Sequence, residues 1–183
     1  MDKVNLSDEQ LVDEFLKGDE SSFKILFERY SQKVFMLVFS YTKDYEDSKD
    51  ITQDIFLKVY TSLKDFKKRS KFSTWIYRIS VNHAISFLRK NKKEKNLVSF
   101  DQINESEIED YDEEKIEYDK KLAERLLFEL PENQRIAFIL SQREGKKYKE
   151  IAEILNVSEK AVESLVYRAR ENLREKLEKE SKV

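Results

Sequence analysis

The sequence YKEIAEILNVSEKAVESLVYRAR, residues 148–170, decides the fold of this chain. Its first eight residues place their apolar side chains on one helical face, and Asn156-Val157 can then turn the chain. A second amphipathic run begins after Ser158, whose hydroxyl can cap a helix start. Two helices joined by a tight turn are typical of a helix-turn-helix unit, whose second helix can enter a DNA major groove.

Apolar side chains explain how this unit would close on itself. Small Ala152 lets the two helices approach, and we expect Val157 to fill the turn between them. The inward positions of the two helices are Ile151, Ala152 and Leu155 on the first and Val162, Leu165 and Val166 on the second. The second helix then exposes polar candidates for base and phosphate contact, namely Lys160, Ser164, Tyr167, Arg168 and Arg170.

The rest of the chain is also helical in its pattern. Two Gly and one Pro among 183 residues are too few for an all-β protein with its many tight turns. Ser7 and Gln10 form a capping box, and apolar residues then recur every three or four positions from Glu20 onward. We predict an all-α chain with a helical domain over residues 1–96 and a helix-turn-helix domain over residues 114–183.

A change of composition separates these two domains. Apolar content falls after residue 97, and ten acidic residues between 101 and 119 are relieved only by Lys115. Such a segment can bury too little apolar surface to offset the entropy of ordering its backbone. We therefore expect residues 97–113 to form a flexible acidic linker.

Basic charge gathers just before that linker, although the formal net charge is only −2. Between residues 58 and 95, only Asp65 and Glu94 are acidic. The loop within this region carries Lys67, Lys68, Arg69 and Lys71, bracketed by Phe66 and Phe72 and followed by Trp75. Cationic groups that track phosphates, together with aromatic rings that stack on bases, favour single-stranded nucleic acid.

Four polar side chains form a stripe opposite Ile51, Ile55 and Val59, and they are Asp47, Asp50, Gln53 and Asp54. Like charges four residues apart disfavour a helix by roughly 0.2–0.5 kcal/mol, so an acidic stripe needs compensation. One interpretation places Asp47 and Asp50 in a first helical turn, where they favour the helix dipole. The other interpretation is a docking surface.

Several functions find no support in the sequence. The chain has no Cys, which excludes disulfides and thiolate sites, and it has no Gly-rich phosphate loop or metal-ligand motif. The single His83 has no catalytic partner at a recognisable spacing, and we assign it to structure. No signal core or membrane-spanning run occurs, so we expect an intracellular protein without membrane insertion.

Four stretches together resemble the extracytoplasmic-function subfamily of bacterial RNA polymerase sigma factors. The first three stretches are residues 19–30, residues 50–56 (DITQDIF) and residues 65–90, which contain FSTWIYRI. The fourth consists of Leu130-Pro131-Glu132 together with residues 148–170. Each stretch alone is weak, but their joint occurrence in this order is specific.

The resemblance implies a two-domain factor that needs no cofactor or metal. Asp50, Gln53 and Asp54 would dock on the clamp helices of the polymerase β′ subunit. The loop from Phe66 to Lys71 with Trp75, Arg78 and Asn82 would hold the melted non-template strand of the minus-ten element, with Phe66 and Asn82 at the base contacts. The second domain would contact the β flap and read duplex minus-thirty-five DNA, and an anti-sigma factor is an expected partner.

The chain departs from the family pattern at Ser86, Lys147, Glu163 and Leu165. We add Ser158 and Glu163 to the residues of the second helix that are expected to contact minus-thirty-five DNA. A Glu that faces DNA repels phosphate but can accept a hydrogen bond from a cytosine amino group. This departure bears on the promoter sequence and leaves the predicted fold unchanged.

Two other functions remain open on the residues alone. A free-standing helix-turn-helix repressor would bind duplex operators as a dimer, and a metal-dependent nuclease would use the Asp stripe.

Overall fold

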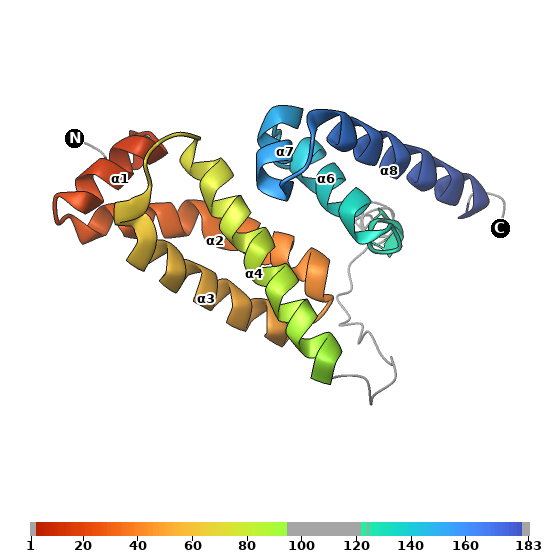
Figure 1. The fold of residues 1–183 in the computed structure, drawn as a ribbon, viewed down its shortest axis with the longest axis horizontal. Helices are drawn as coiled ribbons and strands as arrows, with labels where there is room; N and C mark the ends of the chain where they lie inside the picture. The colour runs from red at the N-terminus through yellow and green to blue at the C-terminus, as the bar shows by residue number, and fades with distance from the viewer. Residues whose placement is uncertain (1–2, 95–121, 124, 181–183) are drawn as a thin grey trace, which may run out of the picture.

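The computed structural model describes residues 3–94, 122–123 and 125–180, and every regular element in those ranges is helical (Figure 1). The first half contains α1 (Asp8–Leu16), α2 (Glu20–Thr42), α3 (Tyr45–Ser62) and α4 (Phe72–Glu94), with 3₁₀ turns at Lys3–Asn5 and Leu63–Asp65. The second half contains α6 (Glu132–Gln142), α7 (Tyr148–Leu155) and α8 (Glu159–Glu180). The all-α prediction is confirmed.

The capping box at the start of α1 is present as the sequence predicts. The Ser7 amide donates to Gln10 Oε1 at 2.8 Å, and the Gln10 amide donates to Ser7 Oγ at 3.2 Å. Each bond satisfies an N–H group that has no partner inside the helix. Gly18 then adopts a φ of +102°, which lets the chain reverse before α2.

A first apolar core joins the four helices of the N-terminal half. Ile51, Ile55 and Val59 are buried on one face of α3, and Phe72 and Ile76 bring α4 into the same cluster. Full burial of each such side chain contributes about 1.5–3 kcal/mol relative to exposure. The predicted shared core of these helices is confirmed.

Two left-handed residues shape the second half. Gly145 has a φ of +58°, and the Lys146 amide next to it donates to the Leu140 carbonyl at 2.9 Å, which closes the end of α6. Asn156 has a φ of +55° at the end of α7, and Ser158 Oγ accepts from the Ala161 amide at 3.2 Å. Asn tolerates this conformation better than most residues with a Cβ. The predicted helix-turn-helix is therefore present.

Val157 corrects one detail of that prediction. Its side chain is 41% exposed, so it does not fill the turn, and Ile154 (1% exposed) is the buried residue near the end of α7. The left-handed backbone at Asn156 reverses the chain before Val157, which leaves that side chain on the surface. Val162 and Val166 are fully buried, as expected, and Leu165 is partly buried.

A second apolar cluster spans both halves of the molecule. It contains Leu37 and Tyr41 from α2, Tyr77, Val81 and Ala84 from α4, and residues of α6, α7 and α8. In Figure 1, α6 and α7 lie against α2 and α4, on the side opposite α3. The two halves are thus packed together through side chains, an arrangement that the sequence pattern did not predict. The predicted linker, residues 97–113, lies outside the described residues.

Candidate functional site

The acidic stripe of α3 is partly buried at Asp47 and exposed from Asp50 to Asp54. Asp50, Gln53 and Asp54 are exposed, and the buried residues of the helix lie on its other face. Helix α3 begins at Tyr45 with Asp44 as its cap, so Asp50 lies beyond the first turn. The dipole interpretation therefore fails for Asp50, because the dipole effect is confined to the first turn. Neither Asp50 nor Asp54 forms an ion pair with another described residue.

The same face of α3 continues into two exposed apolar residues. Leu57 is 65% exposed and Tyr60 is 41% exposed, and they follow Gln53 and Asp54 at helical spacing. Apolar side chains of this size usually become buried when a surface binds a partner. The sequence analysis omitted them, although the spacing of three and four residues could have revealed them. Together, Asp50, Gln53, Asp54, Leu57 and Tyr60 form what we call the α3 face.

The cations of the basic loop, between Leu63–Asp65 and α4, differ in whether they form ion pairs. Lys67 and Arg69 are exposed and form no ion pair with a described residue. Lys68 pairs with Asp13 of α1 at 2.5 Å, and Lys71 pairs with Glu150 of α7 at 3.0 Å. A surface pair such as Lys68–Asp13 contributes only about 0–1 kcal/mol, so a phosphate group can compete for Lys68, whereas the carboxylate that holds Lys71 is largely buried.

Phe66 is buried, with only 7% of its surface exposed. Its ring centroid lies 5.2 Å from that of Trp75 and 6.0 Å from that of Phe72. In this conformation a base cannot stack on Phe66. Trp75 is partly buried, and Arg78 and Asn82 follow it at helical spacing on the exposed side of α4.

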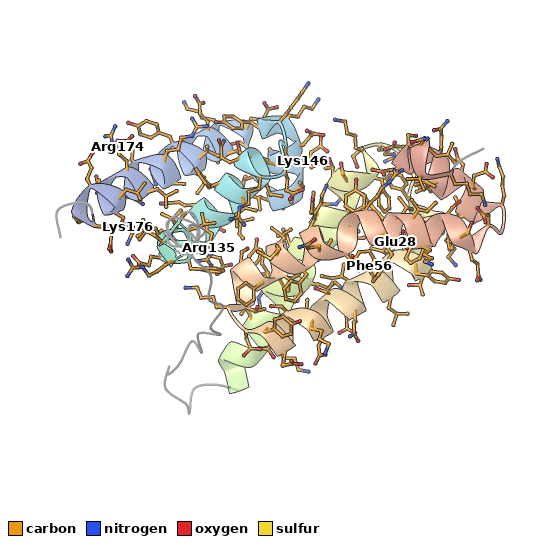
Figure 2. The ribbon with its side chains drawn as sticks, turned by 180° about the vertical axis from the view of Figure 1, so that it is seen from behind. Glu28, Phe56, Arg135, Lys146, Arg174 and Lys176 are labelled. Carbon is orange, nitrogen blue, oxygen red and sulfur yellow. The ribbon has the colours of Figure 1, made fainter. Side chains whose placement is uncertain are left out.

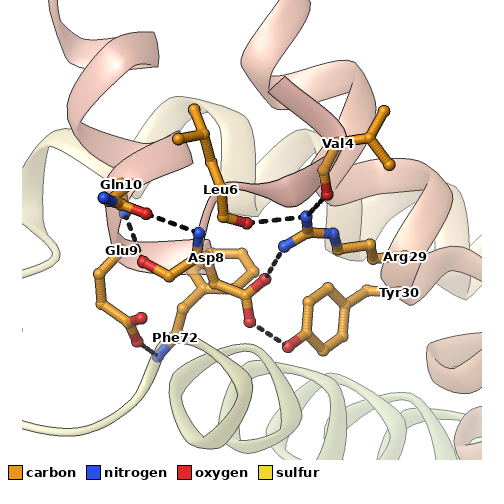
Figure 3. A network of polar contacts seen from close by, with 9 residues as sticks. Val4, Leu6, Asp8, Glu9, Gln10, Arg29, Tyr30 and Phe72 are labelled. Atoms are coloured by element: carbon orange, nitrogen blue, oxygen red, sulfur yellow. Dashed lines mark hydrogen bonds and ion pairs between the residues drawn. The ribbon is translucent and has the colours of Figure 1, made fainter. Parts of the chain in front are cut away.

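Helix α1 holds the start of α4 through a polar network (Figure 3). Glu9 Oε1 accepts a hydrogen bond from the Phe72 amide at 3.1 Å, so a carboxylate from another helix caps α4. Asp8 accepts from Arg29 Nη1 at 2.8 Å and from the Tyr30 hydroxyl at 2.5 Å. Burial and the neighbouring Asp8 carboxylate both raise the pKa of Tyr30. The sequence analysis missed this network, because no local pattern links residues so far apart.

The first half of α8 presents the predicted DNA-reading face. Lys160, Glu163, Ser164, Tyr167 and Arg168 are exposed, opposite the buried Val162, Val166 and Ala169. Arg170 and Ser158 are also exposed, and Ser158 caps the helix. An open pocket of about 430 Å³ lies on this face, lined by Glu163, Ser164, Tyr167 and Arg168.

In the second half of α8, two cations pair with acidic residues, whereas Lys179 forms no ion pair with a described residue. Arg174 pairs with Glu171 at 2.8 Å, and Lys176 bonds to Glu129. Figure 2 shows both cations on the C-terminal half of the helix. Lys160, Arg168 and Arg170 form no ion pair with a described residue. Lys160 and Arg168 thus lie unpaired in the N-terminal half of α8, the half by which a recognition helix meets DNA, and Arg170 lies at the middle of the helix.

Three polar contacts join the basic loop and α4 to the helix-turn-helix half. Lys71 pairs with Glu150, Lys146 Nζ donates to Ser73 Oγ at 2.6 Å, and the Tyr77 hydroxyl donates to Glu144. Figure 2 shows Lys146 at the junction between α7 and α4. Burial lowers the pKa of Lys146, whereas burial and the Glu144 hydrogen bond raise the pKa of Tyr77. In this conformation the helix-turn-helix half covers one side of the predicted minus-ten surface.

Two further observations concern the described residues alone. Within those ranges, no three His, Cys, Asp or Glu side chains lie close enough together to hold a metal ion. Among the helices described, none is long and apolar enough to span a bilayer.

Comparison with protein families gives two matches. Residues 26–94 match the model for sigma-70 region 2, and residues 120–173 match the model for sigma-70 region 4. These segments contain the α3 face, the basic loop and the helix-turn-helix.

Curated relatives match over nearly the whole chain. The chain is 33% identical to the ECF RNA polymerase sigma-E factor of Haemophilus influenzae, covering 94% of this chain and 96% of the relative. It is also 33% identical to the sigma-E factor of Escherichia coli K12, covering 95% of that relative.

Solved structures share the fold. CnrH, solved in complex with the cytosolic domain of CnrY, has a TM-score of 0.70 at 23% identity, covering 93% of this chain and 97% of its own. The sigma factor RpoE of Bartonella quintana, solved with the anti-sigma factor NepR, has a TM-score of 0.69 at 24% identity, covering 85% and 96%.

Proposed function

The chain belongs to the extracytoplasmic-function (ECF) family of RNA polymerase sigma factors, and from that premise we propose that three of its surfaces divide the work of initiation. As a member of this family, it binds core RNA polymerase and directs transcription from specific promoters. The residues assigned below to each task are our proposal.

The α3 face holds core polymerase on the β′ clamp helices. Asp50 and Asp54 supply charge without a described intramolecular partner, Gln53 can both donate and accept, and the exposed Leu57 and Tyr60 supply apolar area. A charged stripe beside an apolar patch suits a protein interface, because apolar burial gives affinity and charge gives orientation. This surface belongs to the domain over residues 1–96.

The basic loop and the exposed side of α4 hold melted minus-ten DNA. Lys67, Lys68, Arg69 and Lys71 follow the phosphates, while Trp75, Arg78 and Asn82 face the bases. An unstacked base costs a few kcal/mol, which a fitting pocket must offset. In the conformation described, the buried Phe66 ring packs against the Trp75 ring. Base contact by Phe66 itself requires the loop to open.

The first half of α8 reads duplex minus-thirty-five DNA, and its domain, residues 114–183, also contacts the β flap. Ser158, Lys160, Ser164, Arg168 and Arg170 offer hydrogen bonds to phosphates and base edges, and Tyr167 offers an exposed ring. In a helix-turn-helix, the N-terminal part of the second helix enters a major groove, which supports this assignment for Ser158, Lys160 and Ser164.

In the proposed role, this chain carries out no covalent chemistry. We propose that it acts in the cytoplasm, because its partners there are RNA polymerase and promoter DNA. We also propose an anti-sigma factor as a regulatory partner, which the family resemblance suggests.

The observation that carries the proposal is the order of surfaces in one packed unit. Asp50 and Asp54 of α3 form no ion pair with a described residue, and they are followed along the chain by the exposed Lys67 and Arg69 of the loop and by the polar side of α4. A repressor needs no such stripe beside its DNA surface.

The test is transcription in vitro from a library of random promoters, with core polymerase in the presence and absence of the chain. We expect initiation that depends on the chain at a shared motif of two elements. Binding to duplex DNA without any initiation would instead support a repressor.

A further inference from the structure

Glu163 has a carboxylate without a partner among the described residues, and it lies on the proposed DNA-reading face of α8. It is the fifth residue of the helix, it is exposed, and it forms no hydrogen bond or ion pair with another described residue. Lys160 lies one turn before it and Tyr167 one turn after it on the same side. The acid therefore stands where an approaching duplex would meet it.

Three acids farther along α8, Glu171, Glu178 and Glu180, have ion-pair partners, whereas Glu175, like Glu163, has none among the described residues. Glu171 pairs with Arg174 at 2.8 Å, and Glu178 lies 3.9 Å from the same guanidinium. A face built only to hold phosphates would carry no acid at position 163, because the carboxylate repels them. Glu163 must instead meet a hydrogen-bond donor on the DNA if it is to favour binding.

The space beside the carboxylate is open. Glu163, Ser164, Tyr167 and Arg168 line the pocket of about 430 Å³ on this face. Ser164 Oγ already donates to the Lys160 carbonyl at 3.0 Å. A base edge can therefore reach Glu163 without first displacing a partner, and Tyr167 and Arg168 line the same pocket.

The hydrogen-bonding groups that each base presents in the major groove limit which base Glu163 can contact favourably. Cytosine presents only an amino donor among polar groups there, which matches an acceptor-only carboxylate. Adenine presents an amino donor beside the N7 acceptor, and N7 repels a carboxylate while suiting the amide of Asn or Gln. Guanine and thymine present acceptors, which a carboxylate also repels.

We propose that Glu163 selects cytosine at one position of the upstream promoter element. This inference rests on the proposed function, since it assumes that α8 reads duplex DNA. It assigns Glu163 as a residue that determines sequence specificity, beyond the general role of the helix.

The experiment uses the full chain with core polymerase on a promoter library whose upstream duplex element is randomised. Templates that initiate are sequenced, and the same library is also selected for binding to the chain and to its complex with polymerase. The variants are Glu163→Gln, Glu163→Ala and, as a matched control, Glu175→Gln, an exposed acid on the later part of the same helix.

The unmodified chain should prefer cytosine at one upstream position by about tenfold or more. Glu163→Gln should move that preference to adenine, Glu163→Ala should abolish it, and Glu175→Gln should leave the motif unchanged. The rest of the motif should stay the same in all four proteins.

The two possible failures are distinguishable. If initiation occurs but Glu163→Ala only strengthens binding to every sequence without changing the motif, Glu163 does not read a base and the inference is overturned. If no template initiates, the proposed function fails, and the binding selection still shows whether a cytosine preference depends on Glu163.

Discussion

At the scale of single residues, the charges that we propose to be functional differ from the structural ones in having no ion-pair partner among the described residues. Lys67 and Arg69 of the basic loop, like Asp50 and Asp54 of α3, form no ion pair with a described residue. Lys176, in contrast, bonds to Glu129. A charge without a partner in the chain can pair with another molecule without first breaking an ion pair. Mutation of such a charge should therefore affect binding more than stability.

Asp54→Lys should weaken binding to core polymerase by about tenfold or more while leaving the free energy of unfolding nearly unchanged. Reversing an exposed charge at an interface juxtaposes like charges, whereas exposed surface changes usually alter stability by about 0.5 kcal/mol or less. Fluorescence titration with labelled core polymerase measures the first quantity and urea denaturation the second. Glu14→Lys on α1 is the matched charge reversal, and equal affinity loss in both variants would contradict a specific α3 face.

Lys67→Ala and Arg69→Ala should each reduce the salt dependence of binding to melted promoter DNA. Each lost phosphate contact lowers the slope of log K against log salt by about 0.7 for single strands. The measurement is anisotropy of a labelled template with an open bubble, bound to the chain with core polymerase, between 50 and 200 mM salt as a rough working range. Lys176→Ala serves as the control, and a slope unchanged in the loop variants would place the strand elsewhere.

At the scale of elements, α1 positions the basic loop, which we propose to bind DNA, through contacts with the loop and the start of α4. Glu9 caps α4 through the Phe72 amide, and Asp13 holds Lys68 within the loop. Asp8 fixes α1 to α2 through Arg29 and Tyr30. The loop is therefore held at one end by a carboxylate cap and in its middle by a surface ion pair, and both contacts come from the same helix.

Glu9→Ala should destabilise the chain by about 1 kcal/mol, the usual cost of losing a helix cap. Glu9→Gln keeps an oxygen that can accept from the Phe72 amide, so it should lose less. Urea denaturation gives the free energies, and amide hydrogen exchange at residues 72–75 reports the cap directly. Equal losses in both variants would trace the effect to the charge of Glu9 in the first turn of α1 instead of the cap.

At the scale of the whole molecule, the proposed minus-ten and minus-thirty-five surfaces belong to two halves that are packed against each other. Tyr77 of α4 contributes both a ring to the shared cluster and a hydrogen bond to Glu144. Two promoter elements named for positions 25 base pairs apart lie about 85 Å apart along duplex DNA at 3.4 Å per base pair. The two halves must therefore separate when both elements are bound at once.

Core polymerase and promoter DNA should lower energy transfer between dyes placed on the two halves. The chain has no Cys, so Lys24→Cys and Glu175→Cys give two unique labelling sites on exposed helix surfaces. Glu144→Lys should lower the transfer even without polymerase, because it removes the acceptor of the Tyr77 hydroxyl and places a cation near Lys146.

Glu153→Lys makes the same charge reversal on the exposed side of α7, and it should leave the transfer unchanged. A transfer efficiency that stays constant on binding polymerase and promoter would contradict the need for separation.

The amino-acid sequence by itself determined the features that depend on local order. The helical periodicity, the capping box at Ser7 and the turn at Asn156 depend on residues within a few positions of one another, so their physical causes are visible in the sequence. The exposure of Asp50 and Asp54 follows from the same periodicity, because the opposite face of α3 is apolar.

Only the tertiary structure decided the contacts between distant residues. Glu9 meets Phe72 across 63 positions, and Tyr77 meets Glu144 across 67. The burial of Phe66 depends on Trp75 and Phe72 folding over it, and the exposure of Val157 depends on the backbone at Asn156. Such contacts are set by how complete helices pack, and packing depends on side chains from several elements at once, which no local pattern contains.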